Sequence, residues 1–150
     1  MSKILVSFAT MSGNTERVAQ YINSELPKIS PETQVSLVNM MELTEELFNE
    51  HDLNILGSST WTDGEFNPIS EEFFNRFSAS TIDLNGIKFA IFGLGESYYP
   101  EFCTVVEKME NVIKSKNGLI VTESLKLDGY VDDNMLHSVG EWLNQFVNTI

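Results

Sequence analysis

The sequence predicts an α/β fold in which a doubly wound, five-stranded parallel sheet is covered by helices on both faces. Three nearly continuous apolar runs, at residues 4–8, 53–57 and 88–93, are typical of strands buried on both sides. Each run is followed by a polar loop and then by a segment with apolar residues at helical spacing. This alternation of strand and helix favours a parallel sheet between two layers of helices.

The first half of the chain follows this order. A helix is expected after the first strand, because four apolar residues share one helical face: Val18, Ala19, Ile22 and Leu26. Pro27 and Pro31 are expected to mark the connection to an alternating edge strand at 34–38. Residues 42–49 form at most a short acidic helix before the central strand at 53–57.

The second half repeats the alternation. The expected elements are a helix at 68–77, a turn at Asn85-Gly86, a strand at 88–93, a long helix, a last strand at 119–122 that resumes at 125–127, and a final helix from about Asp133. Gly118 is expected to end the long helix. Phe73 and Phe77 share one helical face, and Trp142 lies on or beside the apolar stripe of the final helix, so we expect all three to be core residues.

Composition narrows the classes of function. The 150 residues, 42% of them apolar, fit a single domain spanning 1–150. The formal charge of −13 makes nucleic acid and anionic membranes poor partners. The sequence shows no targeting segment or membrane span, so we expect a soluble, cytoplasmic monomer. The single cysteine, Cys103, offers neither an internal disulfide nor a thiolate cluster for a metal.

The loop after the first strand suits a phosphate. Hydroxyl or amide side chains stand at Thr10, Ser12, Asn14 and Thr15, and Gly13 lets the backbone curl inward. The first amide groups of the following helix lack intrahelical partners and carry the positive end of its dipole, which stabilises an anion. The alternative is that Ser12 or Asn14 only caps the helix. The loop has no lysine and one glycine, which excludes a Walker loop and a dinucleotide fingerprint.

Two further polar loops follow central strands, and in such folds ligands bind beyond the carboxyl ends of the strands. The loop at 58–65 contains Trp61, and the loop at 94–103 contains Tyr98 and Tyr99. A planar heterocycle between these aromatic side chains, tethered by a terminal phosphate, would use all three loops. Flavin mononucleotide (FMN) has that shape.

The motifs of the three loops together resemble those of flavodoxins. They are residues 10–16 (TMSGNTE), 57–61 (GSSTW), and 92–97 (FGLGES) with Tyr99 and Phe102-Cys103, and the segment 125–129 (LKLDG) is similar as well. The resemblance covers essentially the whole chain and implies strand order 2-1-3-4-5. The last strand lacks the insertion that marks long-chain members, so the chain resembles a short-chain flavodoxin.

The resemblance implies a non-covalent FMN, with its phosphate in the first loop and its isoalloxazine ring against the other two. Trp61 and Tyr99 would flank the ring, although Tyr98 offers a comparable face, and backbone groups of Leu94, Gly95 and Glu96 would meet the pyrimidine edge. The cofactor-binding residues expected are Thr10, Met11, Ser12, Gly13, Asn14, Thr15, Ser58, Ser59, Thr60, Trp61, Thr62, Gly64, Gly93, Leu94, Gly95, Glu96, Tyr98, Tyr99, Phe102 and Cys103.

Two positions depart from the pattern of some relatives. Thr62 stands where some relatives have a glycine. A β-branched residue adopts a positive φ at a higher energetic cost than glycine does. Thr62 would therefore reduce the stabilisation of the flavin semiquinone. Glu101 replaces an aromatic residue, which would leave the flavin edge more acidic and more exposed.

The function implied is a low-potential one-electron carrier that shuttles between semiquinone and hydroquinone. Its expected partners are basic redox proteins, such as a flavoprotein NADP reductase, and low-potential acceptor enzymes. The alternatives are an FMN-dependent quinone or NAD(P)H reductase and a phosphoacceptor receiver domain. The receiver would need acidic residues where this chain has Thr10-Met11 and Ser58-Ser59. No catalytic or metal-ligating residue is expected, and His51 and His137 are read as ordinary histidines.

Overall fold

The computed structural model describes residues 2–60, 66–95 and 103–149 and confirms the doubly wound parallel sheet. The strands are β1 Lys3–Ala9, β2 Gln34–Asn39, β3 Leu53–Ser59, β4 Lys88–Gly95, β5 Leu119–Ile120 and β6 Leu125–Asp128. Their order is β2-β1-β3-β4-β5, and every pairing between these strands is parallel. β5 pairs with the start of β4 and β6 with its end, so the two short strands together fill the place of the expected fifth strand.

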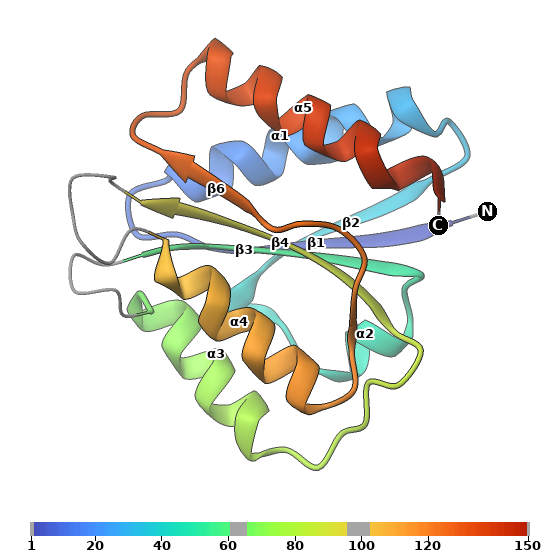
Figure 1. The fold of residues 1–150 in the computed structure, drawn as a ribbon, viewed down its shortest axis with the longest axis vertical. Coiled ribbons are helices and arrows are strands. Elements are labelled where there is room, and N and C mark those ends of the chain that lie inside the picture. Colours follow the sequence, from blue (N-terminus) through green and yellow to red (C-terminus); the bar gives the residue numbers. More distant parts are fainter. Residues whose placement is uncertain (1, 61–65, 96–102, 150) are drawn as a thin grey trace.

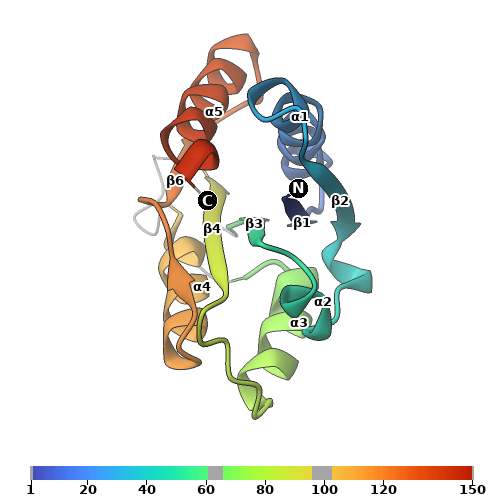
Figure 2. The ribbon, with the colours of Figure 1, turned by 90° about the vertical axis from the view of Figure 1, so that its right-hand side faces the viewer.

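The helices form two layers, one on each face of the sheet (Figures 1 and 2). The first layer holds α1 Asn14–Ile29 and α5 Asp133–Phe146. The second layer holds α2 Glu46–Asn49, α3 Pro68–Ala79 and α4 Thr104–Ser115. Short 3₁₀ turns at Met40–Glu42 and Val147–Thr149 complete the described elements. Among the described residues, no helix has the length and apolarity needed to cross a membrane.

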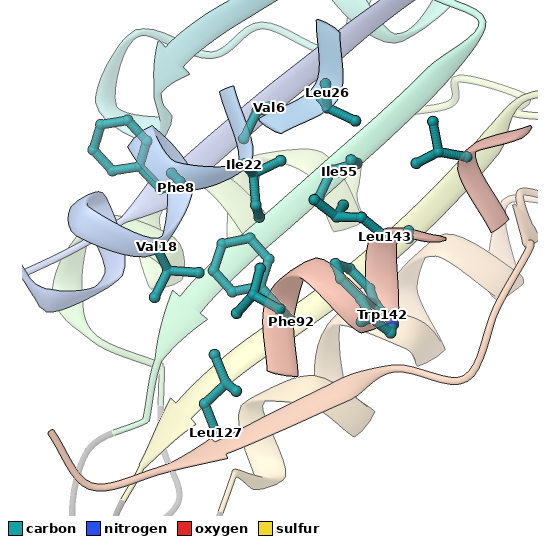
Figure 3. Packing of buried hydrophobic residues seen from close by; sticks show 14 of the residues in the cluster. Val6, Phe8, Val18, Ile22, Leu26, Ile55, Phe92, Leu127, Trp142 and Leu143 are labelled. Atoms are coloured by element: carbon teal, nitrogen blue, oxygen red, sulfur yellow. The ribbon is translucent and has the colours of Figure 1, made fainter. Parts of the chain in front are cut away.

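Each face of the sheet has its own core. Figure 3 shows the first core, where Val6, Ile55 and Phe92 of the sheet meet Ile22 of α1 and Leu143 of α5. The second core is built around aromatic side chains: Phe48, Phe73, Phe74, Phe77 and Phe89 are fully or almost fully buried and meet mostly edge to face. Residues of β1 alternate between the two cores, as a strand buried on both sides must.

Two expectations about helix ends were wrong. Pro27 lies inside the last turn of α1 rather than in the connection. The helix continues through Pro27 because the proline removes only one helical hydrogen bond there, and Leu26 and Ile29 on either side still pack into the core. α4 ends at Ser115, and the residue with positive φ after it is Asn117 (φ 70°) rather than Gly118. Gly118 serves packing, because a Cβ there would lie 2.5 Å from Cγ2 of Ile113.

Candidate cofactor site at the carboxyl edge of the sheet

The carboxyl ends of β1 and β3 mark the point where the strand order reverses. From β1 the chain enters α1 on one face of the sheet, and from β3 it continues into α3 on the other. Ala9 and Ser58, near these strand ends, are register partners. Folds of this kind bind ligands in the crevice that opens at such a point, so the candidate site is centred here.

The amino terminus of α1 is open. Its first flanking residue, Gly13, has φ 92° and provides no side-chain cap. The Gly13 N–H donates instead to Oγ1 of Thr10 at 2.9 Å, and the first helical bond runs from the Arg17 N–H to the Gly13 carbonyl at 3.0 Å. The alternative that Ser12 or Asn14 caps this helix is therefore not what the structure has. The positive end of a 16-residue helix faces the loop without a side-chain acceptor.

Thr15 adds a buried donor at the same place. Its side chain is 1% exposed, and its Oγ1 has no hydrogen-bond partner within the described parts of the chain. A buried hydroxyl without a partner is costly, whereas an oxyanion at the helix terminus would satisfy it. A Cβ at Gly13 would meet no described atom within 4 Å, so the loop is not crowded at this position. The residues present fit a phosphate group.

The second loop begins with serines that are used inside the protein. Ser58 is buried, and its hydroxyl donates to Oγ of Ser70 at 2.9 Å. Oγ of Ser59 accepts a hydrogen bond from Nδ2 of Asn67 at 2.8 Å. Both serines therefore support the base of the loop, and direct contact with a cofactor stays a prediction for them. Thr60 continues the sheet through its N–H to the Leu94 carbonyl at 2.8 Å and leaves a buried Oγ1 without a partner among the described residues.

The third loop starts at the end of β4. Gly93 has a packing reason to be glycine, because a Cβ there would lie 2.5 Å from Cγ2 of Val106 in α4. Leu94 is nearly buried, and the Gly95 carbonyl accepts from the Gly129 N–H at 3.0 Å. The segment after β6 is thereby fixed beside the end of β4. Contact of these backbone groups with a cofactor remains a prediction.

Cys103 is a buried packing residue at the start of α4. Its backbone is left-handed, with φ 51°, and its Sγ lies 3.8 Å from the Leu127 carbonyl oxygen. Burial raises the pKa of the Cys103 thiol to about 12, against a smaller lowering by a backbone hydrogen bond of Leu127. A thiol of this kind stays protonated at neutral pH and is a poor nucleophile.

Seven of the residues expected at the cofactor lie outside the described parts of the chain. They are Trp61, Thr62, Gly64, Glu96, Tyr98, Tyr99 and Phe102. The ring-stacking roles and the choice between the two tyrosines therefore stay predictions.

Sequence reasoning missed Asn67, which is fully buried and bonds to the ends of β1 and β3. Its position directly before Pro68 is a signal of a helix amino terminus and predicts its capping role. No local pattern predicts its bonds to the strands.

In the described ranges, no three His, Cys, Asp or Glu side chains are placed to hold a metal ion. Nδ1 of His51 lies 2.7 Å from the Leu47 carbonyl oxygen in the segment before β3, and Nε2 of His137 lies 2.7 Å from a carboxylate oxygen of Glu141 along α5.

Comparison with known proteins agrees with this geometry. The sequence model of the family described as Flavodoxin matches residues 6–142. The probable flavodoxin 2 of Bacillus subtilis is 37% identical over 130 residues, which are 85% of this chain and 83% of the relative. The flavodoxin of Maridesulfovibrio salexigens is 32% identical over 131 residues, 86% of this chain and 88% of the relative. The crystal structure of oxidised flavodoxin 2 from Bacillus cereus superposes with a TM-score of 0.90 at 33% identity, covering 99% of this chain and 100% of the other.

Proposed function

Because this chain belongs to the flavodoxin family, we propose that it carries single electrons on a non-covalently bound FMN between redox partner proteins. It acts as an electron-transfer protein. In each cycle its flavin alternates between the one-electron reduced and the two-electron reduced form, and this step has a low reduction potential. The observation that supports this most directly is the uncapped start of α1 with the buried hydroxyl of Thr15, which has no hydrogen-bond partner among the described residues. It lies where the strand order reverses and where a phosphate would be held without a cation.

The protein's own residues bind and orient the cofactor. The amide groups at the start of α1, together with the hydroxyl of Thr15, hold the phosphate, and Gly13 leaves room for it. The ends of β3 and β4 carry the two loops that flank the ring, and the bond from the Thr60 N–H to the Leu94 carbonyl keeps their bases together. FMN supplies the redox chemistry when bound, and the protein tunes it through the groups near the ring.

The ring loops are acidic, and this acidity supports a low potential for the last electron. Asp63, Glu65, Glu96 and Glu101 lie in these two loops, at positions outside the described residues. Negative charge beside the flavin disfavours a further negative charge on it, so the fully reduced form is held at low potential.

Four measurements test this function. The purified protein should be yellow, and removal of the flavin should give an apoprotein that quenches FMN fluorescence on binding. Anaerobic redox titration followed by visible absorbance should resolve two one-electron steps. Oxidation of NAD(P)H by the protein without a partner would contradict the carrier role and favour the reductase alternative.

The acids of the ring loops also indicate basic partners. We expect these acids to steer the exposed edge toward a basic reductase or acceptor, so that association slows as salt shortens the screening length from ~10 Å at 0.1 M. Glu65→Gln with Glu101→Gln should therefore lower the electron-transfer rate at low ionic strength. The matched pair is Glu45→Gln with Glu46→Gln, which lies at α2 on the helix layer away from α1. Equal salt slopes for the two double variants in stopped flow would contradict steering by the site edge.

A further inference from the structure

Asn67 lies directly at the point where the strand order reverses. It is fully buried and precedes Pro68, the first residue of α3. Its Nδ2 donates to the Ala9 carbonyl at 3.1 Å and to Oγ of Ser59 at 2.8 Å. Ala9 is the last residue of β1, directly before the phosphate loop, and Ser59 is the last residue of β3, at the base of the second loop. One amide group thus bonds to the bases of two cofactor loops.

The other half of the same amide caps α3. Oδ1 of Asn67 accepts from the N–H groups of Ile69 at 3.0 Å and Ser70 at 3.1 Å. These two contacts fix the orientation of the side chain, because only the oxygen can face two N–H groups while the nitrogen faces the Ala9 carbonyl. A serine or aspartate would cap the helix equally well. Neither would supply the amide donors, so the capping role alone does not explain an asparagine.

The two ends of FMN must be held at a fixed separation, since the phosphate and the ring belong to one molecule. The phosphate loop begins one residue after Ala9, and the second loop is closed at its base by the pairing of Thr60 with Phe66, the residue before Asn67. A ligand that bridges two loops gains most when the loops are already held at the matching distance, because little ordering is then lost on binding.

We infer that Asn67 is a positioning residue that sets the phosphate loop and the second loop at the separation FMN requires. It touches neither end of the cofactor in this role, and it acts through Ala9 and Ser59. This inference rests on the proposed FMN function. In this role Asn67 would help the protein to bind FMN more tightly than riboflavin, which has the same ring without the phosphate.

The chain offers a matched control for this role. Asn54 is also fully buried, and its Nδ2 donates to two backbone carbonyls, those of Phe48 and Lys88, both at 3.3 Å. It lies near the start of β3, at the opposite edge of the sheet. Replacing either asparagine with serine removes buried amide bonds between elements, but only Asn67→Ser loosens the cofactor loops while keeping a good helix cap.

The test measures the dissociation constants of FMN and riboflavin for the apoprotein by quenching of flavin fluorescence. In Asn67→Ser the ratio of the riboflavin constant to the FMN constant should fall by about tenfold, because the phosphate loop no longer stays in register with the ring loops. In Asn54→Ser the ratio should remain that of the wild type, even though unfolding in urea shows lower stability for both variants.

Each outcome has one meaning. A wild-type protein that does not bind FMN overturns the proposed function. A wild type that binds FMN, with an unchanged ratio in Asn67→Ser, overturns the positioning role and leaves Asn67 as a helix cap. If Asn67→Ser does not fold, Asn67→Thr also removes the amide donors and keeps a helix cap. A lower ratio in Asn67→Thr supports the inference, and equal weakening of both flavins overturns it.

Discussion

The amino termini of α1 and α5 lie on the same face of the sheet and at the same edge (Figure 1). They differ in capping, because a side chain accepts a hydrogen bond from a free amide group at α5, whereas the flanking residue of α1 offers no side-chain cap. At α5 the carboxylate of Asp132 accepts a hydrogen bond from the Met135 N–H at 2.8 Å. At α1 the flanking residue is Gly13, which offers no side chain, and the hydroxyl of Thr15 is buried without a partner in the described structure.

The difference separates a helix end with a structural cap from the helix end at which we propose that the phosphate binds. A carboxylate at the terminus of α5 satisfies the amides and repels other anions. An open terminus forgoes that stabilisation in the free protein, and a bound phosphate restores it. A hydrogen bond from Nη1 of Arg17 in α1 to the Val131 carbonyl before α5, at 3.3 Å, holds the two termini as neighbours. The contrast therefore arises from one flanking residue in each helix.

The largest effect is expected when α1 receives a carboxylate like that of α5. Gly13→Asp places a negative charge where the phosphate would bind, at a position where a Cβ would meet no described atom within 4 Å. We expect FMN affinity to fall on the order of 100- to 1000-fold, because two negative charges would be about 4 Å apart near the surface. Riboflavin affinity should change little. The control is Gly13→Asn, which has the same shape and tolerates positive φ. Equal losses in the two variants would show that backbone strain rather than charge is responsible.

The next effect concerns the buried hydroxyl. Thr15→Ala should weaken FMN binding by roughly 0.5–3 kcal/mol, because it removes a buried donor that has no partner among the described residues and that the phosphate would satisfy. Asn134 occupies the corresponding second position of α5 and is exposed, so Asn134→Ala is the matched control and should leave affinity unchanged. Fluorescence titration of both apoproteins measures this difference. Undiminished affinity in Thr15→Ala would remove the phosphate from this helix terminus.

A smaller effect is expected on stability at α5. Asp132→Ala removes the cap and should lower the free energy of unfolding by about 1 kcal/mol, without changing the ratio of riboflavin to FMN dissociation constants. Ser12→Ala in the loop before α1 should not cost capping energy, because the Ser12 side chain does not cap α1. Urea unfolding of the apoproteins compares the two. Equal destabilisation would mean that the two termini are alike after all.

The smallest effect on stability at neutral pH is expected at Cys103, directly before the amino terminus of α4. Its raised pKa of about 12 predicts negligible alkylation of the folded protein at pH 8 and rapid alkylation after unfolding. The unfolded chain loses the thiol proton near pH 9.0, before the folded protein does. Stability from this group is thus complete below pH 9.0 and is lost as the pH rises toward 12. Cys103→Ala should flatten that decline in alkaline unfolding curves, and an unaltered decline would contradict the assignment.

Much of the fold could be predicted because it depends on local periodicity. The apolar run before Gly13 became β1, and the face formed by Val18, Ile22 and Leu26 became the buried side of α1. Gly13 itself was predicted as the residue that curls the loop, and it has the positive φ that glycine allows. These features follow from sterics and side-chain spacing within a few residues, so the sequence alone determined them.

Other features depend on residues that are far apart in the chain, and only the tertiary structure decided them. Asn67 meets Ala9, 58 positions away, because β1 and β3 end side by side. Gly93 and Gly118 are glycines because Val106 and Ile113 occupy the space that a Cβ would need. Whether Ser12 or Asn14 capped α1 was likewise open in the sequence, since both are good caps locally. These features depend on packing and on hydrogen bonds between distant residues, so no local sequence pattern predicts them.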